Sequence, residues 1–171
     1  MYRTKDGRRI YLGKASPGEL GSFVKFWQAL ADERKYIATE HVTPEQKRGW
    51  RRGISSPRAL WAVAKIDGEL AGVLTLSSYY GPLKKTKHVK NLGMGVAKGY
   101  RGTGVGSALM DYAIRWARGK GVEKIELSVF STNETAIRLY EKFGFEREGV
   151  ARQQFLIDGR YVDEVMMGRF V

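Results

Sequence analysis

The sequence contains no cysteine and only two histidines, His41 and His88. The lack of cysteine excludes disulfide bonds, thiolate metal sites and a cysteine nucleophile. Two histidines are too few for a multi-histidine metal site, so we expect no bound metal.

Long apolar runs are also missing. No run approaches the ~18 residues that a membrane-spanning helix needs. The first ten residues, "MYRTKDGRRI", lack the apolar core of a signal peptide. We therefore expect a cytoplasmic protein without a membrane partner.

The overall composition is that of a globular protein. Hydrophobic residues make up 43% and aromatic residues 12% of the 171 residues, which supplies enough apolar surface for a core. The chain shows no repeat, no low-complexity segment and no linker-like stretch. We expect one domain over residues 1–171.

Acidic residues are few relative to basic ones, and the formal net charge is +12. Basic runs such as "KRGWRR" (47–52) and "KKTKHVK" (84–90) could attract nucleic acid, a ribosome or an anionic cofactor. No zinc-finger spacing, basic zipper or RNP-like aromatic motif accompanies them. A solvated basic surface is the simpler explanation, and a basic nucleic-acid-binding domain is the alternative class.

Strand and helix patterns alternate along the chain and predict a mixed α/β (α+β) fold. Ser16 and Pro17 form a helix start before an apolar stripe at helical spacing. Asp67-Gly68 is a hairpin signal between two apolar strands. The expected strands are 8–12, 59–66, 69–80, 88–97, 124–130 and two strands around the turn 157–161; the expected helices are 16–33, 43–53, 105–117 and 131–144, the last with Ser131 and Glu134 as a capping box.

Three glycines follow Arg101 at the point where a strand gives way to a helix: Gly102, Gly104 and Gly106. The first N–H groups of a helix have no helical partners, and the helix dipole adds positive potential. Because glycine permits φ > 0 and close approach, the stretch predicts a phosphate-binding site, with Arg101 as an added charge. It fits neither a Walker A loop, which ends in Gly-Lys-Ser/Thr, nor a dinucleotide fingerprint, whose third glycine would fall at Ser107.

The run "RGTGVG" (101–106) matches Arg/Gln-x-x-Gly-x-Gly/Ala, the signature of the GNAT superfamily of acyl-CoA-dependent N-acetyltransferases, which this sequence resembles. The surrounding "LGMGVAKGYRGTGVGSALM" (92–110) resembles the family's fourth strand, pyrophosphate loop and third helix. "STNETAIRLYEKFGFEREG" (131–149) resembles its second motif. The closing "RQQFLIDGRYVDEVMMGRF" (152–170) looks like members that acetylate ribosomal-protein N-termini, polyamines or other small amines.

The resemblance implies the GNAT fold, which has a central mixed, mostly antiparallel twisted sheet flanked by about four helices and splayed between strands 4 and 5 at a bulge. It also implies acetyl-CoA as cofactor and CoA as product. Gly93 and Gly95 suit a bulge or a close approach of another group. The implied cofactor-binding residues are Met94, Gly95 and Val96 on the strand, where a backbone amide would hold the oxyanion, and Arg101, Gly102, Thr103, Gly104, Val105, Gly106 and Ser107 in the loop.

The second motif implies three further roles. In the family, the residue matching Asn133 contacts the cofactor, and the small Ala136 would leave room for the cofactor arm. The residue matching Tyr140 is the general acid for the departing thiolate, since a phenol is protonated at neutral pH yet can donate a proton. A helix-cap role for Asn133 and a core position for Tyr140 are the alternatives.

The general base is left open. Many relatives place a carboxylate on the fourth strand, and "HVKNLG" (88–93) has none. Glu40, His41 and Glu126 are candidates, and a water relay without a single base is the other option.

The amine acceptor is expected beside the first two helices and their connection. Asp32, Glu33 and Glu40 could attract a cationic amine, and Tyr79 and Tyr80 could wall the cleft. The resemblance implies direct attack by a primary amine of a protein N-terminus, a lysine or a small molecule, and a homodimer is compatible with it. A non-catalytic CoA-binding module of the same fold is the alternative.

Overall fold

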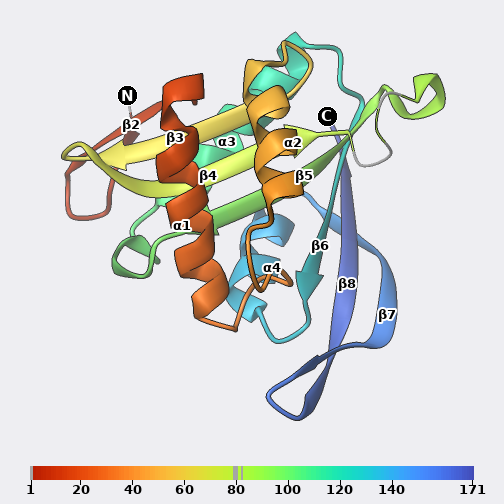
Figure 1. The fold of residues 1–171 in the computed structure, drawn as a ribbon. Coiled ribbons are helices and arrows are strands. Elements are labelled where there is room, and N and C mark those ends of the chain that lie inside the picture. Colours follow the sequence, from red (N-terminus) through yellow and green to blue (C-terminus); the bar gives the residue numbers. More distant parts are fainter. Residues whose placement is uncertain (1, 79–80, 82) are drawn as a thin grey trace.

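The computed structural model describes residues 2–78, 81 and 83–171 and consists of one eight-stranded sheet with four α-helices (Figure 1). The strands are β1 (Tyr2–Arg3), β2 (Arg9–Lys14), β3 (Leu60–Ile66), β4 (Glu69–Ser77), β5 (Val89–Val96), β6 (Lys124–Phe130), β7 (Glu146–Ile157) and β8 (Arg160–Phe170). The helices are α1 (Leu20–Asp32), α2 (Pro44–Ser55), α3 (Val105–Gly119) and α4 (Glu134–Lys142), with short 3₁₀ turns η1 (Pro17–Glu19), η2 (Lys84–Thr86) and η3 (Lys98–Tyr100). The predicted α+β architecture is confirmed.

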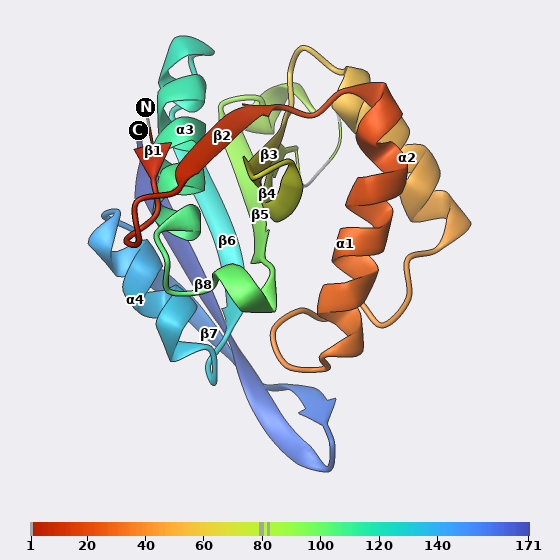
Figure 2. The same cartoon turned by 90° about the vertical axis from the view of Figure 1, so that its left-hand side faces the viewer.

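The sheet is mixed and mostly antiparallel, as predicted. Its strand order is β1-β2-β3-β4-β5-β6-β8-β7, and among the described residues only the β5–β6 pair is parallel. Figures 1 and 2 show α1 and α2 on one face of the sheet and α3 and α4 on the other. The hairpin turns at 67–68 and 158–159 have positive φ at both central residues, which matches the twist of the flanking strands.

Two hydrophobic cores hold these layers together. The larger lies between the sheet and the pair α3 and α4, and its fully buried members include Val105, Leu109 and Met110. The smaller lies under α1 and α2 and is aromatic, with the Phe23 and Trp61 ring centroids 5.0 Å apart. Close aromatic pairs add to the area that they bury, so this cluster fixes the two helices against β3 and β4.

Two local predictions were wrong. Ser131 does not cap α4: the N-cap is Asn133, whose side chain accepts a hydrogen bond from the Ala136 N–H at 3.3 Å. The strand β5 has no bulge against β4, since their register runs unbroken from Gly72–Val96 to Ser77–Asn91.

None of the helices in the described part of the chain is long and apolar enough to cross a membrane.

Candidate active site

The strands β5 and β6 separate soon after they meet. They pair only from Val89–Lys124 to Asn91–Glu126, whereas β4 continues to pair with β5 as far as Val96. Residues 92–96 of β5 therefore have a strand partner on one side alone, and Figure 1 shows β6 turning away from β5. We call this region, between residues 92–96 and residues 127–130, the strand opening. The predicted splay is confirmed, and it forms without a bulge on the β4 side.

The strand opening exposes backbone amides of β5. The Ala97 N–H donates to the Ala71 carbonyl on the β4 side at 3.0 Å. Because successive residues of a strand direct their N–H and C=O groups to opposite sides, those of Met94 and Val96 face away from β4. The Val96 carbonyl accordingly accepts a hydrogen bond from outside the sheet, from Arg101 Nε at 3.0 Å. The N–H groups of Met94 and Val96 are directed into the strand opening, where β6 does not pair with them.

The glycine loop ends at the N-terminus of α3. Gly102 and Gly104 have φ of +74° and +105°, and Gly104 is the N-cap residue. Val105 is fully buried in the larger core, whereas Gly106 and Ser107 are half-buried. The N–H groups of these three residues belong to the first turn of α3, where anions are favoured.

Gly106 has a second, structural role. A Cβ at this position would lie 3.1 Å from Leu139 Cδ2, so the lack of a side chain lets α3 pack closely on α4. The same hypothetical atom would lie 3.8 Å from Val96 Cγ2 and 3.9 Å from Met94 Cε. The start of α3, the end of β5 and the middle of α4 therefore meet at one point.

Arg101 does not extend freely from the loop. Its guanidinium donates two hydrogen bonds to the Glu33 carboxylate, at 2.6 and 2.8 Å, and lies 4.9 Å from the centre of the Tyr36 ring. These hydrogen bonds lower the pKa of the Glu33 carboxyl. The predicted phosphate contact of Arg101 stays a prediction, because it would require the pair with Glu33 to open.

The N-terminal segment supports the glycine loop. The sequence did not predict this contact. The Lys5 N–H donates to the Thr103 carbonyl at 2.9 Å, and the Thr103 hydroxyl donates to the Tyr100 carbonyl at 2.7 Å. The role of Thr103 in the structure is thus to hold the loop in shape. No pattern within residues 1–8 indicates this contact, because it joins segments about a hundred residues apart.

Helix α4 carries the three residues of the second motif. Asn133 uses its side-chain oxygen to cap the helix, and Ala136 is half-buried against the larger core. Tyr140 is buried, with its ring 5.8 Å from that of Phe145, and burial raises the pKa of its hydroxyl to about 12. Within the described residues this hydroxyl has no hydrogen-bond partner, and its role as proton donor stays a prediction.

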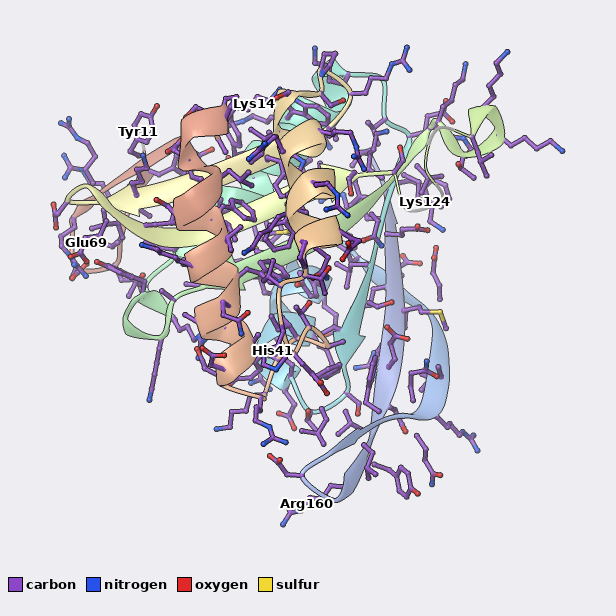
Figure 3. All side chains as sticks on the ribbon, viewed as in Figure 1. Tyr11, Lys14, His41, Glu69, Lys124 and Arg160 are labelled. Carbon is purple, nitrogen blue, oxygen red and sulfur yellow. The ribbon has the colours of Figure 1, made fainter. Side chains whose placement is uncertain are left out.

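The three candidate bases lie in different places. Glu126 forms the last pair between β5 and β6, with Asn91, at the closed end of the strand opening. It is half-buried and lies on the sheet face that α1 and α2 cover, opposite to Ile125 and Leu127. Glu40 and His41 are exposed on the connection between α1 and α2, where Figure 3 labels His41. Only Glu126 lies on a strand that borders the opening.

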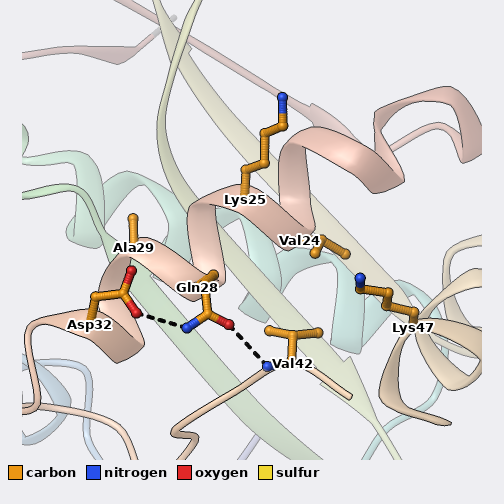
Figure 4. A pocket seen from close by; sticks show the side chains of 7 residues that line it. All are labelled: Val24, Lys25, Gln28, Ala29, Asp32, Val42 and Lys47. Carbon is orange, nitrogen blue, oxygen red and sulfur yellow. Dashed lines mark hydrogen bonds between the residues drawn. The ribbon is translucent and has the colours of Figure 1, made fainter. Parts of the chain in front are cut away.

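The acidic residues expected near the acceptor have different partners, and their role stays a prediction. Glu33 is paired with Arg101, while Asp32 accepts a hydrogen bond from Gln28 Nε2 at 2.8 Å on the outer side of α1. Figure 4 shows that the same Gln28 accepts from the Val42 N–H, at 3.0 Å, beside a hollow of about 330 Å³. Gln28 Nε2 also donates to the Glu40 backbone carbonyl at 3.1 Å, and Glu40 is exposed. Tyr79 and Tyr80 lie outside the described residues.

Comparisons with known proteins agree with this geometry. Residues 23–145 match the model of the acetyltransferase (GNAT) family. The L-amino acid N-acetyltransferase AaaT of Escherichia coli is 35% identical over 83% of this chain and 88% of its own. The N-alpha-acetyltransferase RimI of Mycobacterium tuberculosis is 30% identical over 68% of this chain and 70% of its own.

The fold also matches a solved structure, that of yncA from Salmonella typhimurium with its cofactor acetyl-CoA. It has a TM-score of 0.85 and 17% identity, and covers 95% of this chain and 94% of its own. With the family model matching most of the sequence, the chain belongs to the GNAT family of N-acetyltransferases, which transfer an acetyl group from acetyl-CoA to an amine.

Proposed function

We propose that residues 1–171 form one catalytic domain that transfers an acetyl group from acetyl-CoA to the α-amino group of an amino acid or of a peptide N-terminus. The observation that carries the proposal is the strand opening, in which two backbone N–H groups without strand partners lie close to the N-terminus of α3. When bound, acetyl-CoA supplies an activated acyl carbon and a thiolate leaving group. The thioester of acetyl-CoA needs N–H groups such as those of β5, and its pyrophosphate needs an anion site such as the N-terminus of α3.

Different residues of the chain would then have different roles in the reaction. The Met94 and Val96 N–H groups would hold the acyl oxygen as negative charge develops on it. The first turn of α3, from Val105 to Ser107, would hold the pyrophosphate. Tyr140 would return a proton to the leaving thiolate.

We propose that Glu126 is the general base, which accepts the proton that the amine must lose, either directly or through one water molecule. It lies at the closed end of the strand opening and on the sheet face of α1 and α2, from which the acceptor would approach. Glu40 and His41 are exposed on a separate connection.

We expect Glu126→Gln to lower kcat/KM for the amine at neutral pH by about 10²-fold, because a positioned general base contributes at least that much. The loss should shrink as pH rises, since more of the amine is then already deprotonated. Glu40→Gln and His41→Gln are the matched controls and should keep wild-type pH–rate profiles. A wild-type profile for Glu126→Gln would favour proton loss to water without a single base.

The proposed acceptor class rests on the relatives and on the partners that the nearby acidic side chains already have. The names of the two relatives above specify an amino acid and an N-alpha amine, and both substrates carry an α-amino group. A polyamine or lysine acceptor would gain most from free carboxylates, but Arg101 pairs with Glu33 and Gln28 donates to Asp32. An α-amine has a lower pKa than a lysine amine and needs less help to lose its proton.

The function can be tested in two stages. First, CoA and acetyl-CoA should raise the melting temperature of the purified protein, and AMP should not. Second, release of free CoA thiol should be measured with acetyl-CoA and a panel of free amino acids, short peptides, polyamines and blocked lysine. Turnover with amino acids or peptides alone would support the proposal. Binding of CoA without turnover on any amine would point instead to a non-catalytic CoA-binding module.

A further inference from the structure

Helix α1 packs directly on bare backbone of β5. The odd-numbered residues of β5 face α1, and two of them are Gly93 and Gly95. A Cβ at Gly95 would overlap the Leu30 Cδ1 methyl group and lie 3.5 Å from Phe26 Cε1. A Cβ at Gly93 would lie 3.8 Å from Trp27 Cη2. The glycines that suggested a strand bulge thus allow α1 to approach the strand.

This contact lies at the proposed acyl site. The N–H groups of Met94 and Val96 flank Gly95, so an acyl oxygen held by either of them would place the acyl chain next to this glycine. On the other face of β5, the Met94 and Val96 side chains fill the space, together with Leu139 of α4. On the α1 side β5 has no side chain at Gly93 or Gly95, and the groups nearest to Gly95 there are Leu30 and Phe26.

Leu30 is well placed to limit the length of that chain. It is 5% exposed, yet it belongs to neither of the two hydrophobic cores. Its Cδ1 methyl group lies over Gly95, near the end of β5. Its side chain has three more carbons than alanine, and a butyryl group has two more carbons than an acetyl group.

We propose that Leu30, with Phe26 beside it, sets the acyl-chain limit of this enzyme by closing the α1 side of the strand opening above Gly95. The inference rests on the proposed function, since it assumes that an acyl-CoA binds along β5. A hydrophobic pocket distinguishes ligands by about tenfold or more per methylene when there is no room for the addition. The wild-type protein should therefore bind acetyl-CoA at least about tenfold more tightly than butyryl-CoA.

The test compares titrations of CoA, acetyl-CoA and butyryl-CoA in the wild type and in Leu30→Ala. We expect the preference for acetyl-CoA to fall to about threefold or less in Leu30→Ala, with CoA itself bound as in the wild type. Leu20→Ala is the matched control, because it shortens another α1 leucine that packs in the aromatic core instead. It should keep the wild-type preference.

Because truncation of a buried leucine can destabilise the fold, Leu30→Val serves as a milder second variant. It removes one carbon and should improve binding of propionyl-CoA relative to acetyl-CoA. Equal wild-type affinities for acetyl-CoA and butyryl-CoA would overturn the inference. An unchanged preference in both Leu30 variants, with normal CoA binding, would also overturn it. Failure of the wild type to bind CoA at all would overturn the proposed function, and the inference with it.

Discussion

Replacing Tyr140 by phenylalanine should lower kcat by about 10- to 10⁴-fold while leaving the affinity for CoA nearly unchanged. The ring would stay buried and would keep its contact with the Phe145 ring, whose centroid is 5.8 Å away. What is lost is the hydroxyl proton, which the departing thiolate needs. An effect on kcat without an effect on binding is the pattern of a group that acts only in the transition state.

The environment of Tyr140 explains why it would be a dependable proton donor. Burial disfavours the phenolate and raises the pKa of Tyr140 to about 12. A raised pKa keeps the neutral form through the physiological range, and the proton is lost only as the pH rises toward that value. Between pH 6 and 10 the tyrosine should therefore contribute no alkaline decline of its own to the pH–rate profile.

A matched control is Tyr112→Phe on α3, which removes a hydroxyl from a half-buried tyrosine packed against the same core. Both variants should have wild-type melting temperatures to within a few degrees, and only Tyr140→Phe should lose turnover. Equal kcat values for Tyr140→Phe and the wild type would remove Tyr140 from the mechanism and leave it as a core aromatic.

The sequence predicted the fold well where the patterns are local. The hairpin at Asp67-Gly68, the long α3 and the break between strand and helix at the glycine loop are confirmed, because each depends on residues within a short window. The N-cap of α4 is an instructive error. Ser131 and Glu134 have capping-box spacing, but Asn133 is closer to the first helical residue and its own side chain makes the capping bond.

The contacts that shape the candidate site were harder to predict, because they join distant segments. Arg101 was expected at a phosphate and Glu33 at the acceptor, yet the two pair with each other across 68 residues. Leu30 was one apolar residue of a helical stripe, and nothing near it in sequence shows that it lies on Gly95. Such pairings depend on how the layers of the fold meet, which local spacing does not encode.

The position of Glu126 also shows what local spacing can and cannot predict. Its alternation with Ile125 and Leu127 correctly predicted which way it faces. Its place at the closed end of the strand opening follows from the register of β5 against β6, which only the structure gives. The proposal of Glu126 as the base therefore rests on a strand register that the sequence does not reveal.

The second large effect is expected from Gly104→Val, which should weaken CoA binding by at least about 100-fold. Gly104 is the N-cap of α3 with φ +105°, a conformation that costs a non-glycine residue on the order of 1–3 kcal/mol and a β-branched residue more. The strain is conformational rather than steric, since an added Cβ would meet only the Arg3 carbonyl oxygen, at 3.9 Å. Relief of that strain would rotate the peptide groups that lead into α3, and the N–H groups from Val105 to Ser107 would no longer converge on one anion.

Gly99→Val is the control for this variant, because Gly99 lies five residues earlier, has no positive φ and has open space around its Cβ position. It should bind CoA as the wild type does. Titration calorimetry with CoA, together with the melting temperature of each variant, separates loss of the site from loss of the fold. A folded Gly104→Val protein with wild-type affinity would mean that the pyrophosphate is held elsewhere. In that case the row of free amides along β5, and not the start of α3, would have to account for cofactor binding.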